Sequence, residues 1–176
     1  TKTLSAELTP DNDGYYEIAS VEDFEKFAQM MTSDGADKKF KIIDDIALSG
    51  NETFTVPFTG ELVGVAKDDG SLPVISGTNH AIFNSIDGGI VKNIILDNVT
   101  INSGTNVGAI VYEATGASRI YNCGVLATGS TVETDENGYT HITNCSSTIG
   151  GSGFVGGIVG LLDGSSRVIN CFSYAN

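Results

Sequence analysis

Apolar residues along this chain fall in short runs that are separated by Gly, Asn, Asp, Ser and Thr. Residues 40–48 read FKIIDDIAL, and residues 90–101 read IVKNIILDNVTI. This texture predicts many short β-strands joined by turns. Further strands are expected at residues 61–65, 74–75, 81–83 and 139–145.

One segment has the spacing of an amphipathic helix instead. Its apolar positions recur at helical intervals and are Val21, Phe24, Phe27, Ala28 and Met31. Ser20 is placed to cap the first turn, with Asp23 in the position of a capping-box acid. We therefore predict a helix from Val21 to about Met31. A first edge strand is expected at Tyr15–Ile18, after a polar and poorly ordered lead-in at residues 1–14.

The second half of the chain contains a repeat. Residues 106–125 (NVGAIVYEATGASRIYNCGV) align without a gap to residues 154–173 (FVGGIVGLLDGSSRVINCFS), at an offset of 48. The identical pairs are Val107/Val155, Gly108/Gly156, Ile110/Ile158, Val111/Val159, Gly116/Gly164, Ser118/Ser166, Arg119/Arg167, Asn122/Asn170 and Cys123/Cys171. Self-similarity of this kind is typical of stacked architectures in which each unit contacts only its neighbours.

Four asparagines mark the register of these units. Asn93, Asn122, Asn144 and Asn170 each follow an apolar residue two or three places back, and each is followed by Ile or Cys. In stacked parallel strands, equivalent residues lie directly above one another, and Asn tolerates the left-handed backbone of a corner. We predict a right-handed parallel β-helix in one domain, residues 15–176, in which these asparagines form a structural ladder.

The predicted helix has a clear role in such a fold. A β-helix exposes apolar side chains and unpaired strand edges at both ends, and these must be covered. The helix is expected to cap the N-terminal end. No equivalent segment is visible at the other end, so we expect further coils or another domain C-terminal to Asn176.

Charge narrows the choice of partners. The chain has 22 acidic and 9 basic residues, for a net charge of −13. The sequence has no basic patch, so nucleic acid and anionic membrane surfaces are disfavoured as partners. No apolar run approaches the roughly 18 residues of a membrane span. An extracellular or cell-surface location fits this composition.

Three cysteines, Cys123, Cys145 and Cys171, each follow an asparagine. They are expected to stack as a column of buried thiols, one per coil. A disulfide between adjacent coils stays open at this point. No metal site or cofactor is predicted, because Cys-x-x-Cys spacing is missing and neither His80 nor His141 joins a cluster.

No catalytic residue is assigned. The candidate acids are Asp97, Glu113 and Asp163, and in the repeat Glu113 aligns with Leu and Asp163 with Thr, so no repeated pair of acids is visible. Glycoside hydrolysis would need two carboxylates facing each other. Arg119 and Arg167 should stack in register as a small cationic stripe on the surface.

Several of these segments resemble a known family. The sequence YYEI, then SVEDFEKFAQMM and KIIDDIALSG, resembles the opening of bacterial surface proteins that carry the GLUG motif. VGGIVGLLDGSSRVINC at residues 155–171 looks like that motif, with residues 107–123 as a more diverged copy. The family's Phe-Asp-Gly-Asn-Gly-His stretch is missing, and residues 58–65 occupy its place.

The resemblance implies a bacterial cell-surface or secreted protein of the adhesin-like kind. The leading expectation is a non-enzymatic binding or stalk module of a larger surface protein, with a glycan or a host surface protein as partner. One alternative is a carbohydrate-active β-helix, either a polysaccharide lyase or a glycoside hydrolase. Another follows from similar repeats in immunoglobulin A-cleaving metallopeptidases, namely a non-catalytic region of a secreted metallopeptidase.

Overall fold

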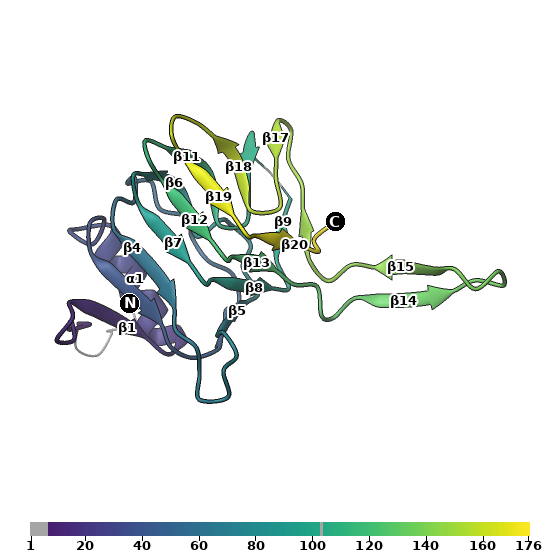
Figure 1. Cartoon of the computed structure of the whole chain (residues 1–176), viewed down its shortest axis with the longest axis horizontal. Helices are drawn as coiled ribbons and strands as arrows, with labels where there is room; N and C mark the ends of the chain where they lie inside the picture. Colours follow the sequence, from purple (N-terminus) through teal and green to yellow (C-terminus); the bar gives the residue numbers. More distant parts are fainter. Residues whose placement is uncertain (1–6, 103) are drawn as a thin grey trace.

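The computed structural model describes residues 7–102 and 104–176 (Figure 1). These residues form one helix and twenty short strands, and nearly all of the strand pairs are parallel. The all-β class expected from the sequence is confirmed.

Three parallel sheets make up the body of the molecule. The first sheet has six strands, β1 (Tyr15–Ile18), β2 (Lys39–Ile42), β4 (Glu61–Gly64), β7 (Ile90–Lys92), β12 (Arg119–Tyr121) and β19 (Arg167–Ile169). The second has β3 (Ile46–Ala47), β5 (Val74–Ser76), β8 (Ile95–Asp97), β13 (Gly124–Val125) and β20 (Phe172–Ser173). The third has β6 (Phe83–Asp87), β11 (Val111–Thr115) and β18 (Val159–Leu162). Two further parallel pairs join β9 (Thr100–Ile101) to β16 (Thr148–Ile149) and β10 (Asn106–Val107) to β17 (Phe154–Val155).

The chain visits the three sheets in a fixed order. It runs through β6, β7 and β8, then β11, β12 and β13, then β18, β19 and β20. We call each such passage a coil. The second and third coils pair in the register of the repeat, with Val111 opposite Val159 and Arg119 opposite Arg167. The two copies of the repeat, 48 residues apart, are therefore one coil stacked on the next.

The helix α1 (Val21–Met31) forms where the sequence predicts it. The Ser20 hydroxyl oxygen accepts a hydrogen bond from the Asp23 N–H at 3.1 Å, and the Asp23 carboxylate accepts one from the Ala19 N–H at 3.1 Å. The first bond satisfies a backbone donor that the first turn leaves without a partner, and the second ties the residue before the cap to the helix. Both ends of the predicted helix are confirmed.

The helix α1 lies across the N-terminal end of the stack (Figure 1). The buried side chains of the helix are Phe24, Phe27 and Met31. The Phe27 ring meets the rings of Phe40 at 4.7 Å and Phe83 at 6.2 Å, both edge-on. The helix thus packs on side chains from two of the three sheets.

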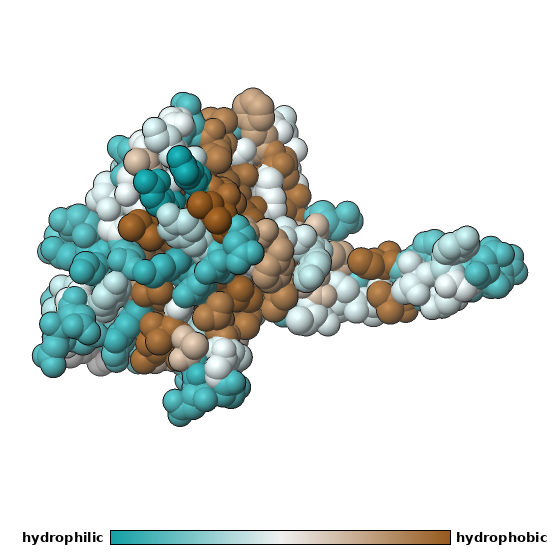
Figure 2. Space-filling model, in the orientation of Figure 1, coloured by the Kyte–Doolittle hydropathy of each residue, from teal (hydrophilic) through white to brown (hydrophobic). Residues whose placement is uncertain are grey.

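The opposite end of the stack presents apolar side chains to solvent (Figure 2). Equivalent positions of the two repeat copies differ in how much of the side chain is exposed. Val107 and Ile120 of the second coil are fully buried, whereas Val155 and Val168 of the third coil are 45% and 37% exposed. Each coil buries the one before it, and none of the described residues does this for the third coil.

An antiparallel hairpin corrects one expectation. Residues 139–145 were expected to form a strand of a stacked coil, but β14 (Thr131–Thr134) and β15 (Thr140–Asn144) pair with each other and project from the body (Figure 1). Ile142 is 65% exposed, and Asn144 pairs with Thr131 across the hairpin. The reason is local, since residues 135–138 (DENG) form a tight turn with Gly138 at a φ of +84°.

The lead-in also differs from the expectation where it is described. Residues 1–6 lie outside the described residues. Pro10 makes an isolated bridge to Tyr16, and the Asp11 carboxylate accepts a hydrogen bond from the Tyr15 N–H at 2.9 Å. The second oxygen of Asp11 lies 2.7 Å from the Lys41 ammonium nitrogen. An aspartate turn and an ion pair therefore fix residues 10–14 to the first sheet.

Candidate functional site

The asparagine ladder exists in three of its four predicted positions. Asn93, Asn122 and Asn170 have φ values of +58°, +50° and +53° and turn the chain from the first sheet into the second. The Asn122 amide donates to the Asn93 side-chain oxygen at 3.3 Å, and the Asn170 amide donates to Asn122 at 2.7 Å. Asn144 is outside the ladder because it lies in the hairpin. The side chains satisfy one another, so the ladder is a structural feature.

One further corner with an asparagine was not predicted from the sequence. Asn98 has a φ of +51° and lies between β8 and β9. The sequence feature that could have predicted this corner is the Asp97-Asn98 pair after an apolar strand, because Asp and Asn favour turns.

Two of the three cysteines stack, as expected. Cys123 is fully buried, Cys171 is half-buried, and the Cys123 N–H points at the Cys171 sulfur, 3.4 Å away. The prediction that Cys145 is a third member of the column is wrong, because Cys145 directly follows the hairpin strand β15. Its sulfur lies 3.1 Å from the carbonyl oxygen of Ser147. All three thiols are free.

The two stacked thiols differ in acidity. A hydrogen bond from the Cys123 thiol lowers the pKa of Cys171 to about 6, because it stabilises the thiolate. The same bond, together with burial, raises the pKa of Cys123 above its ordinary range. Cys171 is therefore the nucleophilic member of the pair.

The three candidate acids serve separate turns and strands. The Asp97 carboxylate accepts hydrogen bonds from the N–H and the hydroxyl of Thr128. The Asp163 carboxylate accepts the Gly164 N–H at 2.6 Å. Glu113 lies on β11 of the third sheet, whereas Asp97 belongs to the second. Within the described part of the chain, no group of three or more His, Cys, Asp or Glu residues is placed to hold a metal ion.

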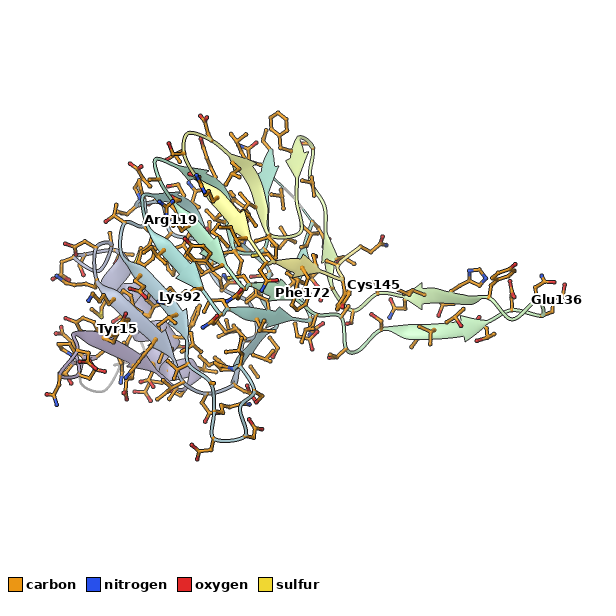
Figure 3. The ribbon with its side chains drawn as sticks, in the orientation of Figure 1. Tyr15, Lys92, Arg119, Glu136, Cys145 and Phe172 are labelled. Atoms are coloured by element: carbon orange, nitrogen blue, oxygen red, sulfur yellow. The ribbon has the colours of Figure 1, made fainter. Side chains whose placement is uncertain are left out.

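The first sheet carries ion pairs, and Tyr15, Lys92 and Arg119 lie on three of its strands (Figure 3). The Lys92 ammonium nitrogen lies 2.8 Å from the Glu61 carboxylate. Burial opposes ionisation of Glu61, yet the hydrogen bonds from Lys92 and Tyr15 and the nearby lysine charges together offset it and lower the pKa of that carboxyl. Arg119 and Arg167 stack in register as predicted. This pair extends over the last two strands of the sheet and does not form a binding pocket by itself.

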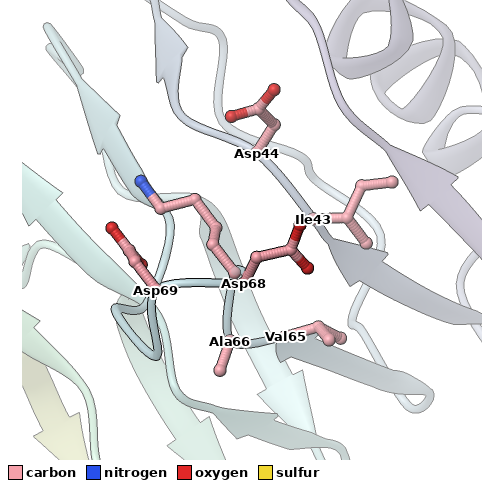
Figure 4. Close-up of a pocket in the computed structure, with 7 residues that line it drawn as sticks. Ile43, Asp44, Val65, Ala66, Asp68 and Asp69 are labelled. Carbon is pink, nitrogen blue, oxygen red and sulfur yellow. The ribbon is translucent and has the colours of Figure 1, made fainter.

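An open depression of about 490 Å³ lies where the chain leaves β2 and β4 of the first sheet (Figure 4). It is lined by Ile43, Asp44, Val65, Ala66, Lys67, Asp68 and Asp69. The Lys67 ammonium nitrogen is engaged by Asp45 at 2.8 Å. None of the seven lining residues is aromatic, so the depression offers no ring on which a sugar could stack. Its three carboxylates make it an acidic surface.

A second depression, of about 410 Å³, lies at the base of the hairpin. Its lining residues are mostly apolar or carry hydroxyls and are Leu126, Ala127, Thr128, Ser130, Val132, Ile142 and Tyr174. It connects the hairpin to the exposed end of the third coil, and its chemistry suits an apolar contact more than a reaction.

Comparison with protein families gives one match. Residues 43–127 match the model of the M26 IgA1-specific metallo-endopeptidase N-terminal region. The matched stretch includes β3 to β13 and therefore the first copy of the repeat. The chain is thus similar, over this stretch, to a region of bacterial metallopeptidases that lies N-terminal in its family.

The remaining comparisons add little. Curated proteins and solved structures gave no match. Among the described residues, no helix has the length and apolar character needed to cross a membrane. Of the functions expected from the sequence, the metallopeptidase alternative has more support than the adhesin-like one.

Proposed function

We propose that this chain is a non-catalytic scaffold region of a secreted or cell-surface bacterial metallopeptidase, folded as a right-handed parallel β-helix. The family match over residues 43–127 carries the proposal, because the matched model describes an N-terminal region of such enzymes. The three candidate acids, each engaged in its own turn or strand, support a non-catalytic role.

The order in which the chain visits the sheets supports the β-helix. Each coil adds one parallel strand to each of the three sheets, and crossovers between parallel strands are almost always right-handed. Asn recurs at the same corner of three successive coils, and Cys follows it in the last two. Such a stack is stiff along its axis, because each inner strand is hydrogen-bonded to the coils on either side.

A stiff stack is suited to holding another domain at a distance. The end opposite α1 provides the attachment surface in this proposal. Its exposed side chains occupy the positions that are buried in the coil below, so a further coil C-terminal to Asn176 would bury them in the same way. A domain attached there would be separated from α1 by the whole length of the stack.

Incubation of the purified chain with immunoglobulin A1 and Zn²⁺ tests this function. We expect the immunoglobulin heavy chain to stay intact, since the metal-binding residues of a peptidase would lie in another part of the parent protein. Heavy-chain fragments would contradict the proposal. In that case Glu113→Gln and Asp163→Asn, with Asp44→Asn as a matched surface control, would show which acid is responsible.

A second candidate function rests on the hairpin. Val132, Tyr139 and Ile142 are 60%, 67% and 65% exposed on a projecting ribbon, and such residues are typical of protein contacts. The hairpin would then bind a protein surface, which keeps the adhesin-like expectation as an alternative. Retention of the chain on immobilised immunoglobulin A1, lost when residues 132–142 are replaced by a Gly-Ser turn, would favour this function.

A further inference from the structure

Cys123 and Cys171 occupy equivalent positions in two adjacent coils. The backbone on either side of them is hydrogen-bonded, from the Asn122 N–H to the Ile169 carbonyl at 3.0 Å and from the Phe172 N–H to the Cys123 carbonyl at 3.1 Å. The two cysteines are therefore in register at stacked corners, Cys123 between β12 and β13 and Cys171 between β19 and β20. The parallel strands that flank these corners lie about 4.8 Å apart, which is within the Cα separation that a disulfide spans.

The Cys171 side chain also reaches into the second coil. The Cys171 sulfur lies 3.4 Å from the Cys123 backbone nitrogen, whose N–H donates to it, and 3.7 Å from the Ile120 carbonyl oxygen. Burial separates their roles, since Cys171 is half-buried and Cys123 has no exposed surface. A reagent from solvent can therefore reach Cys171, whereas Cys123 is reached only through Cys171.

We propose that Cys123 and Cys171 form a dithiol site that a disulfide oxidant converts into a covalent cross-link between the second and third coils. The substrate class is a small-molecule disulfide such as oxidised glutathione. The site rests on the geometry of the two cysteines and not on the proposed scaffold function.

The reaction proceeds in two exchanges. The Cys171 thiolate attacks one sulfur of the oxidant, which breaks the oxidant's S–S bond, releases one thiolate and leaves a mixed disulfide on Cys171. The Cys123 thiol then loses its proton to the released thiolate, and its sulfur attacks the Cys171 sulfur and expels the second thiolate, which takes a proton from water. Overall, two protein thiols are oxidised and one small-molecule disulfide is reduced to two thiols.

The cross-link would act where the stack is weakest. The third coil pairs with the second on one side and is exposed on the other, so it is the coil that opens first. A bond from Cys123 to Cys171 closes the segment that contains the hairpin and ties the third coil to the body. Cys145 lies outside this pair and serves as an internal control.

Mass spectrometry of the native chain tests the site. After exposure to oxidised glutathione and alkylation of the remaining thiols, we expect the protein to have lost two hydrogens and to carry one alkyl group, on Cys145. Trypsin cuts after Arg119 and Arg167, and a glutamate-specific protease cuts after Glu133 and Glu136. Together they separate the Cys123, Cys145 and Cys171 peptides, so the linked pair is identified directly.

Matched variants sharpen the outcome. Cys145→Ser should form the same cross-link, whereas Cys123→Ser should stop at a glutathione adduct on Cys171. The oxidised chain should lose about 5 °C or more of melting temperature when reductant is added. Three alkylated thiols after oxidant treatment, or a link that includes Cys145, would overturn the proposal.

Discussion

At the scale of single residues, asparagines hold the corners of this fold. A left-handed backbone costs an ordinary side chain roughly 1–2 kcal/mol, and Asn tolerates it better than most residues. Asn122 also donates one side-chain hydrogen bond to the coil below and accepts one from the coil above. The corner and the ladder therefore depend on the same residue.

Replacement of Asn122 should show both contributions. We expect Asn122→Ala to lower the free energy of unfolding by about 1–3 kcal/mol, because it strands two amide partners and strains the corner. Asn122→Gly should lower the free energy of unfolding less than Asn122→Ala does, since glycine tolerates the same backbone angles. Asn144→Ala should stay within about 0.5 kcal/mol. Urea unfolding measures all three, and a loss at Asn144 equal to that at Asn122 would contradict the ladder.

The ion pair of Asp11 makes a prediction about pH. Hydrogen bonds from the Lys41 ammonium and the Tyr15 N–H lower the pKa of Asp11 to about 2, from an ordinary value of 3.8. Because the folded pKa is depressed, this stabilisation is present above about pH 4 and is lost as the pH falls through about 2. An NMR titration of the Asp11 carboxyl should give the low value. In Lys41→Met, the pKa should return toward the ordinary value.

Residue patterns predicted part of this detail. Asn93, Asn122 and Asn170 were identified by their shared position after an apolar strand. Asn144 matched the same pattern and was assigned wrongly, since the pattern does not distinguish a coil from a hairpin. The Asp-Glu-Asn-Gly turn at residues 135–138 was the local signal that could have corrected it.

At the scale of elements, α1 is the only described segment that packs across the end of the stack. Its boundaries were predictable because the cap and the apolar spacing are local in sequence. Its partners were not, because Phe40 and Phe83 lie on strands distant in the chain. Sheet membership depends on such long-range pairs, which no single segment reveals.

The cap should be essential to stability. We expect Phe27→Ala to lower the free energy of unfolding by about 3–5 kcal/mol, because the ring is fully buried and contacts aromatic rings from two of the three sheets. Val21→Ala, at a 41% exposed position of the same helix, is the control and should cost less than about 0.5 kcal/mol. Thermal unfolding compares them, and equal effects would show that the helix does not seal the core.

At the scale of the whole molecule, stability should vary along the stack and be lowest in the hairpin. β7 and β12 each have a parallel strand on both sides, β19 has one on a single side, and the hairpin pairs only with itself. The 48-residue repeat predicted the stacking of the last two coils from sequence. The insertion of a projecting hairpin between them was not predictable from the repeat.

Hydrogen exchange of the native chain, followed by mass spectrometry, tests this account most directly. Backbone amides should exchange slowest in β7 and β12, faster in β19, and fastest in β14 and β15, because protection follows the number of neighbouring coils. That order would support a continuous stack with a hairpin outside it. Hairpin amides as protected as those of β12 would contradict the stacked-coil architecture and the scaffold function built on it.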